Sequence, residues 1–186
     1  MNNDNLPRVT DIIREAGLSD FSKVRASILI PAQEFGSAAH KACELDDLGI
    51  LDIDTLSAPL LPYLEAWRKF RKDFNFSFVK DEIERQLVST KWNFKGTPDR
   101  IARADNLLVD IKTSTVIYPS VAIQCAAYAI LAEENGMKIK KRFCVQLKES
   151  GYSITPYSDI SDKTIFLSAL NIYNWRKKHS LLDKSR

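Results

Sequence analysis

The stretch Phe94–Ser114, FKGTPDRIARADNLLVDIKTS, combines a strand-like apolar run with charged residues, and it indicates both the fold and a candidate site. It contains an apolar run, Leu107–Ile111, that is typical of a buried strand, yet Asp110 lies inside the run and Lys112 follows two residues later. Side chains at positions i and i+2 of a strand share a face, so we expect these two charges to project together, opposite the residues that face the core. The pattern fits either a functional site or an edge strand with one solvated face, where an ion pair is worth about 0–1 kcal/mol.

A second carboxylate, Asp99, lies eleven residues upstream of Asp110 and directly follows Pro98. Polar residues separate the two strand-like runs, and a hairpin between these runs would bring Asp99 beside Asp110. Two adjacent carboxylates repel each other unless a cation lies between them, and Mg²⁺ prefers one or two carboxylates together with water and phosphate oxygens. Pro98 removes a backbone donor, so we expect a bend or an edge that leaves the pair accessible. The sequence thus predicts a metal site here.

The segments on both sides of this stretch alternate between helical and strand patterns. Apolar residues at helical spacing predict helices over residues 9–17, 36–49, 55–74, 120–135 and 162–182. Strand patterns predict strands over residues 76–89, 93–104, 106–114, 138–150 and 152–158. Thr10 is the expected N-cap of the first helix, and Gly17 is its expected end.

The order of these segments predicts an α/β fold, a single domain with a central mixed β-sheet flanked by helices. We expect a helical N-terminal part over residues 1–75, a catalytic core over residues 76–158 and a C-terminal helix over residues 160–182. No internal repeat or flexible linker divides the 186 residues, and a hydrophobic share of 45% is sufficient for one core.

The charge distribution and the cysteine content indicate the kind of partner and the compartment of this protein. Residues 1–60 hold 5 Lys/Arg and 10 Asp/Glu, whereas residues 61–186 hold 22 and 14, so the basic later part suits a polyanionic partner. The three cysteines are far apart and form no C-x-x-C pair, which indicates a reducing compartment without a disulfide framework. The start has no signal-peptide pattern and no apolar run approaches the roughly 20 residues of a membrane span, so we expect a soluble, cytoplasmic protein without a membrane partner.

Pro98-Asp99 and Asp110-Ile111-Lys112 together spell the signature of the PD-(D/E)XK nuclease superfamily. The chain resembles the RecB-type and phage exonuclease-like members of that superfamily over about residues 30–130. The resemblance implies a restriction endonuclease-like core that binds a divalent metal, Mg²⁺ or Mn²⁺. One branch of the superfamily binds an iron–sulfur cluster through four cysteines. This chain lacks that pattern, and we expect no iron–sulfur cluster.

Three further segments match the superfamily in the expected order. GSAAHKACE resembles the helix that brings a histidine, here His40, to the site. EIERQLVS resembles the strand with an upstream acidic residue, here Glu84, although Glu82 would share its face in a strand and the choice between them stays open. QCAAY resembles the Q-x-x-x-Y helix and places Gln124 and Tyr128 on one helical face, where they either contact substrate or hold the helix to the sheet as buried hydrogen-bonding groups.

The resemblance implies a role for each of these residues. The expected metal ligands are His40, Glu84, Asp99, Asp110 and the carbonyl of Ile111. The expected catalytic residues are Lys112, Asp99, Asp110 and Glu84, and the expected substrate contacts are Gln124 and Tyr128. The ammonium group of Lys112 would orient the nucleophile, or would accept a proton if desolvation lowers the pKa of Lys112.

The function implied by the resemblance is hydrolysis of DNA phosphodiester bonds to leave 5′ phosphates. The chain has no recognisable base-reading module, so we expect a sequence-non-specific deoxyribonuclease, more an exonuclease than an endonuclease, in phage recombination or repair. Two basic clusters are the expected DNA contacts: Lys69, Arg71 and Lys72, and Arg176, Lys177 and Lys178. A homo-oligomer and a recombination partner protein both stay open. The alternative is a non-catalytic nuclease-fold module that binds DNA or protein.

Overall fold

A mixed sheet of four strands forms the centre of the computed structural model, which describes residues 5–22 and 24–182. The strand order is β3 (Arg100–Ala102), β4 (Leu107–Lys112), β5 (Lys141–Lys148) and β6 (Gly151–Pro156). β4 pairs antiparallel with β3 and parallel with β5, and β6 returns antiparallel to β5. The predicted single α/β domain with a central mixed sheet is therefore confirmed.

Strand β4 lies in the interior of this sheet, and both of its faces are buried. Its odd-numbered residues from Leu107 to Ile111 pack into one hydrophobic cluster, and Leu108 packs into another on the opposite face. Asp110 shares the face of Leu108 and is fully buried. The alternative of an edge strand with one solvated face is thereby excluded, because no face of β4 is open to water over this run.

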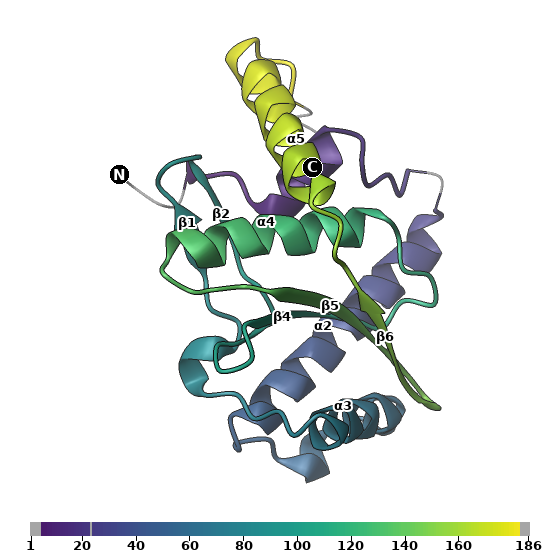
Figure 1. The fold of residues 1–186 in the computed structure, drawn as a ribbon. Helices are drawn as coiled ribbons and strands as arrows, with labels where there is room; N and C mark the ends of the chain where they lie inside the picture. Colours follow the sequence, from purple (N-terminus) through teal and green to yellow (C-terminus); the bar gives the residue numbers. More distant parts are fainter. Residues whose placement is uncertain (1–4, 23, 183–186) are drawn as a thin grey trace.

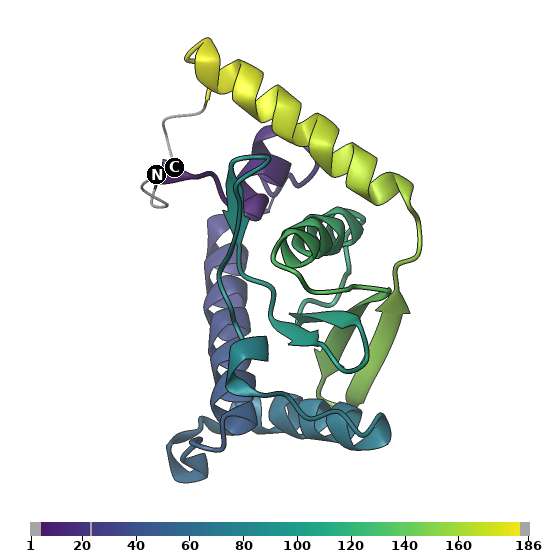
Figure 2. The same cartoon turned by 60° about the vertical axis from the view of Figure 1, so that its left-hand side comes forward.

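Five α-helices of the described residues cover the sheet in layers (Figures 1 and 2). On one face lies α4 (Ser120–Glu134), and α1 (Val9–Glu15) and α5 (Ser161–Lys178) pack against the outside of α4. Helix α3 (Leu61–Asp73) covers the opposite face, and α2 (Ala26–Asp47) runs along the side of the sheet from the level of α4 to that of α3. Because α4 has the sheet below it and helices above it, it is apolar nearly all round. Among the described residues, no helix has the length and hydrophobicity needed to cross a membrane.

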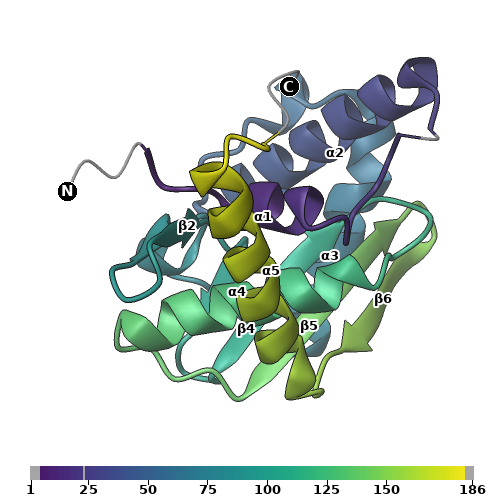
Figure 3. The same cartoon turned by 90° about the horizontal axis from the view of Figure 1, so that it is seen from above.

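A separate two-stranded sheet lies beside α1 and α4 (Figure 3). It consists of β1 (Leu87–Ser89) and β2 (Phe94–Gly96), paired antiparallel. Gly96 allows this close approach, because a Cβ atom there would lie 2.7 Å from Cε1 of Tyr128 and 2.9 Å from Cγ2 of Val9. The chain bends after Gly96, and β2 and β3 belong to different sheets. The bend expected at Pro98 is therefore confirmed, but the accessibility expected for the carboxylate pair was wrong, because Asp99 and Asp110 are both buried.

Several predicted helix boundaries were wrong. α2 begins at Ala26, ten residues before the predicted start, and continues through Pro31. This part of α2 is exposed, so water can bond the carbonyl group that Pro31 leaves without a donor. Arg8, and not Thr10, is the N-cap residue of α1, although Gly17 follows that helix with a φ of 74° as expected for its end. The helix predicted from residue 55 is preceded by short 3₁₀ turns, η2 (Ile53–Thr55) and η3 (Ala58–Leu60).

Of the strand predicted over residues 76–89, only β1, Leu87–Ser89, forms. Upstream of β1 the chain forms a 3₁₀ turn, η4 (Lys80–Glu82), and Glu84 adopts a left-handed φ of 46°. The N–H group of Glu84 donates to the carbonyl of Asp99 at 3.0 Å, a long-range contact that fixes this turn. The alternation of faces expected for Glu82 and Glu84 in a strand therefore does not apply.

Candidate functional site

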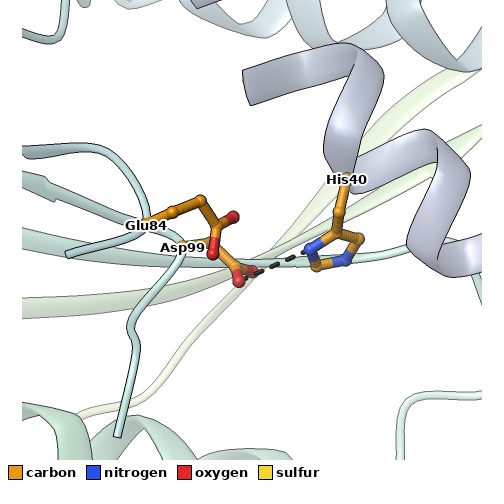
Figure 4. Close-up of side chains that lie close together, drawn as sticks. All are labelled: His40, Glu84 and Asp99. Carbon is orange, nitrogen blue, oxygen red and sulfur yellow. Dashed lines mark ion pairs between the residues drawn. The ribbon is translucent and has the colours of Figure 1, made fainter. Parts of the chain in front are cut away.

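Three polar side chains from separate parts of the chain converge beside the sheet (Figure 4). His40 comes from α2, Glu84 from the turn between η4 and β1, and Asp99 from the segment before β3. One potential ligand atom of each residue lies within 4.8 Å of the other two. An imidazole and two carboxylates at this spacing can hold a divalent metal ion.

Asp99 is held in place from two sides. Its Oδ1 lies 3.4 Å from Nδ1 of His40, and its Oδ2 accepts a hydrogen bond of 2.6 Å from the N–H group of Ile111 in β4. Because Arg100 pairs with Val109 in the antiparallel ladder, the next position in register sets Asp99 opposite Asp110. The hairpin thus brings the two carboxylates to the neighbouring positions that their spacing predicted.

Asp110 lies outside the three-residue group and contacts Lys112. Oδ2 of Asp110 is 2.7 Å from Nζ of Lys112, but neither carboxylate oxygen accepts a hydrogen bond of good geometry from the described residues. The ion pair with Lys112 offsets part of the cost of burying this carboxylate, and a bound cation would offset more of it. The residues present therefore fit a metal ion beside Asp99 and Asp110.

The ionisation of the acidic groups reflects their crowding. Burial opposes ionisation of Asp99, but His40, Lys112 and the N–H group of Ile111 together lower its pKa to about 2. Burial raises the pKa of Asp110 to about 6, with the Asp99 charge adding to the rise and Lys112 opposing it. Negative charge in this small volume thus favours the arrival of a cation.

Glu84 and His40 respond to the same charge on Asp99. Burial and the Asp99 charge raise the pKa of Glu84 to about 7, against the opposing effect of Arg100. Burial disfavours protonation of His40, but the Asp99 carboxylate outweighs burial and raises the pKa of His40.

Lys112 is a cation in this arrangement. Burial alone would lower the pKa of Lys112, but the adjacent Asp110 and Asp99 carboxylates outweigh burial and raise it. The condition under which Lys112 was expected to accept a proton, a pKa lowered by desolvation, is therefore not met. The geometry suits Lys112 to orienting a nucleophile or offsetting phosphate charge.

The remaining predicted site residues lie on α4 and η4. Nε2 of Gln124 donates to the hydroxyl oxygen of Tyr128 at 3.1 Å, and Tyr128 is buried against Gly96. The pair is thus bonded internally, and direct contact with substrate stays a prediction. Glu82 accepts hydrogen bonds from the N–H groups of Arg103 (3.1 Å) and Val79 (3.2 Å). Glu84, and not Glu82, lies beside Asp99.

The predicted DNA contacts divide into paired and unpaired cations. Three form ion pairs within the protein: Lys69 with Asp73, Arg71 with Asp46 and Asp47, and Arg176 with Glu15. Lys72, Lys177 and Lys178 form no ion pair with residues 5–22 or 24–182, and all three are exposed. The unpaired lysines are the better candidates for contacts with a polyanion.

Sequence reasoning missed two residues next to the site, Arg100 and Asp47. Both side chains are fully buried and their charged groups meet at 2.6 Å. Nη1 of Arg100 also donates to the carbonyl of Asp99 and contacts Glu84. The only sequence signal was an arginine directly after Asp99 at the start of an apolar strand.

Comparisons with known proteins show a likeness of fold. The chain is similar to a structure from Eubacterium rectale named "Putative exonuclease", with a TM-score of 0.55 and 12% sequence identity over 97% of this chain and 84% of that one. A second similar structure, SSO0001, aligns with a TM-score of 0.47 and 19% identity over 100% of this chain and 88% of that one. No protein-family model and no curated protein sequence matches the chain.

Proposed function

We propose that this protein is a divalent-metal-dependent nuclease that hydrolyses DNA and leaves 5′ phosphates. The observation that carries the proposal is the group formed by His40, Glu84 and Asp99, with ligand atoms within 4.8 Å of one another. The buried Asp110 carboxylate and the Lys112 ammonium next to this group support it. The likeness of fold to the protein named "Putative exonuclease" also supports a nuclease.

The donor set suits Mg²⁺ or Mn²⁺. His40, Glu84 and Asp99 would hold the ion, with Asp110 and the Ile111 carbonyl as the further ligands implied by the sequence resemblance. A divalent ion bound there would offset phosphate charge and lower the pKa of water. The carboxylates, two of which have raised pKa values, gain a counter-charge when the ion binds.

Lys112 is the proposed catalytic cation of the chain itself. Its pKa is raised, so it carries a positive charge at neutral pH beside Asp110. There it can donate hydrogen bonds to a phosphate oxygen or to the attacking water, and it can offset charge that develops on the phosphate. In-line attack on phosphorus would expel the 3′ oxygen and leave the 5′ phosphate.

The proposed substrate is DNA bound without sequence preference, with an exonuclease favoured and recombination or repair as the role. Exposed lysines such as Lys72, Lys177 and Lys178 suit contacts with phosphate, which carry no sequence information. The sequence contains no recognisable base-reading module, so we propose an enzyme without sequence specificity.

Digestion of linear and circular duplex DNA with Mg²⁺, with Mn²⁺ and with EDTA tests this function. We expect the wild type to cut only with metal, and Lys112→Ala and Asp110→Ala to fold but lose at least 100-fold in rate, as is typical when one charge-stabilising group is removed. Lys138→Ala is the matched control, because Lys138 is exposed and outside the site. Cutting in EDTA, or full activity of Lys112→Ala, would contradict the proposal. DNA binding without any cutting would favour the non-catalytic module.

A further inference from the structure

Arg100 and Asp47 form a buried ion pair that joins the end of α2 to the start of β3. Nε of Arg100 lies 2.6 Å from Oδ2 of Asp47, and both side chains are 0% exposed. Trp67 of α3 fixes the pair, since its Nε1 donates to Oδ1 of Asp47 at 3.0 Å and its ring centroid lies 5.5 Å from the guanidinium carbon of Arg100. The guanidinium group is therefore anchored by two helices.

The other side of the same guanidinium contacts the candidate metal ligands. Nη1 of Arg100 donates to the carbonyl oxygen of Asp99 at 2.6 Å and lies 3.2 Å from Oε1 of Glu84. The Asp99 carbonyl also accepts the N–H group of Glu84 at 3.0 Å. One side chain thus connects two of the three residues in the candidate metal group to helix α2, which carries the third, His40.

The geometry at Glu84 requires such a restraint. Glu84 has a φ of 46°, a left-handed conformation that is strained for any residue other than glycine. Its carboxylate is only partly buried and its only ion pair within the described ranges is with Arg100. Without Arg100, the side chain of Glu84 has no other hydrogen-bond donor in the described structure to fix its direction.

The hydrogen bonding of Arg100 is incomplete, which argues against a purely structural role. Its Nη2 is buried and has no hydrogen-bond partner among the described residues. A buried ion pair is often no more stable than apolar residues of similar volume, and an unsatisfied buried donor makes it less stable still. The arrangement is better explained by its contacts with Glu84 and Asp99 than by its contribution to folding.

We propose that Arg100 is a positioning residue which, held by Asp47, orients Glu84 and Asp99 for metal binding. The proposal rests on the proposed function, because it requires that these residues bind a divalent ion. A positioning role and a purely electrostatic effect predict opposite changes in metal affinity when Arg100 is replaced. Removing a positive charge next to a cation site should strengthen metal binding if charge alone matters. Removing a positioning residue should weaken metal binding, typically by 10–100-fold.

Calorimetric Mn²⁺ titration of the full chain tests the proposal with Arg100→Met and Arg100→Lys. We expect both variants to bind Mn²⁺ at least 10-fold more weakly than the wild type, since lysine keeps the charge but cannot reach Asp47, Asp99 and Glu84 at once. Raising Mn²⁺ should restore cutting by Arg100→Lys but not by Lys112→Ala. Arg103→Lys is the matched control, because Arg103 follows the same strand, is exposed and contacts Glu82 instead.

The outcomes separate this proposal from the proposed function. A wild type that binds no Mn²⁺ overturns the proposed function and this proposal together. A wild type that binds Mn²⁺ while Arg100→Met and Arg100→Lys bind it equally well or more tightly overturns the positioning role alone. If the Arg100 variants fail to fold, Asp47→Asn gives the answer. It keeps the shape of the side chain but removes the charge that anchors Arg100, and we expect weaker Mn²⁺ binding. Unchanged binding in a folded Asp47→Asn overturns the proposal.

Discussion

Asp99 is the residue on which the candidate site depends most. Its two carboxylate oxygens face different partners, His40 on one side and the Ile111 N–H group on the other. Burial and this same carboxylate raise the pKa values of Glu84 and Asp110, and Asp99 is itself ionised. A single aspartate thereby keeps negative charge at the site over the physiological pH range, which is the condition for binding a divalent cation.

Metal binding to Asp99 should appear as a gain in stability. We expect saturating Mn²⁺ or Mg²⁺ to raise the melting temperature of the wild type, since a ligand at 100 times its Kd adds about 2.7 kcal/mol to the free energy of unfolding. Asp99→Asn should remove most of this rise. Asp81→Asn is the matched control, because Asp81 is exposed on η4. Equal rises in the wild type and Asp99→Asn, measured by differential scanning calorimetry, would be inconsistent with a metal at this residue.

Helix α4 and strand β2 show how the elements bring the site together. Tyr128 of α4 packs directly over Gly96 of β2, and β2 leads through Pro98 into the segment that carries Asp99. The contact is tight because glycine presents no Cβ atom. The distance between α4 and β2 thus fixes where the chain turns toward the candidate metal group.

A side chain at Gly96 should destabilise this contact. We expect Gly96→Ala to lower the free energy of unfolding by about 1–3 kcal/mol, the usual cost of overpacking a well-packed core. Gly36→Ala in α2 is the control, because its Cβ would lie at an ordinary 3.4 Å from Oγ1 of Thr113 and alanine favours a helix by about 0.5–1 kcal/mol. Urea denaturation measures both changes. A Gly96→Ala protein as stable as the wild type would show that α4 and β2 can separate without cost.

Only some of the basic residues of this protein are free to contact a polyanion. Some basic residues of the range 61–186 are neutralised by ion pairs within the protein, as in Arg71 with Asp46 and Arg176 with Glu15. At the exposed end of α5, Lys177 and Lys178 form no ion pair with any residue that the structure describes. Contacts of the whole protein with DNA are therefore expected to depend on these exposed lysines more than on net charge.

DNA affinity should fall when the exposed lysines of α5 are removed. In a catalytically inactive Lys112→Ala background, Lys177→Ala with Lys178→Ala should weaken binding similarly for all sequences and reduce the slope of log K against log salt by about 1–2. The matched double variant Lys138→Ala with Lys140→Ala removes the same charge from the chain before β5. Fluorescence anisotropy over a salt series measures the slopes. Equal losses in both double variants would show that affinity follows net charge and not the α5 surface.

Local patterns in the sequence were sufficient for much of the fold and for part of the candidate site. The buried strand β4, the apolar helix α4 and the β5–β6 hairpin were predicted because alternation and helical spacing report on near neighbours in the chain. The approach of Asp99 to β4 was also predictable, since the register of a short hairpin follows from its own residues. Local patterns predicted two helix starts wrongly. Helix α2 begins before Pro31, in an exposed segment, and the N-cap of α1 is Arg8 instead of Thr10.

Contacts between distant parts of the chain required the folded protein. The position of Glu84 follows from the bond between its N–H group and Asp99, which forces a left-handed turn that no strand pattern contains. Asp47 and Arg100 are 53 residues apart and meet only because α2 crosses beside β3. Such pairs produce no periodic pattern in the sequence. The two residues become buried and adjacent only when the helices pack on the sheet, and that packing determines the energy of the pair.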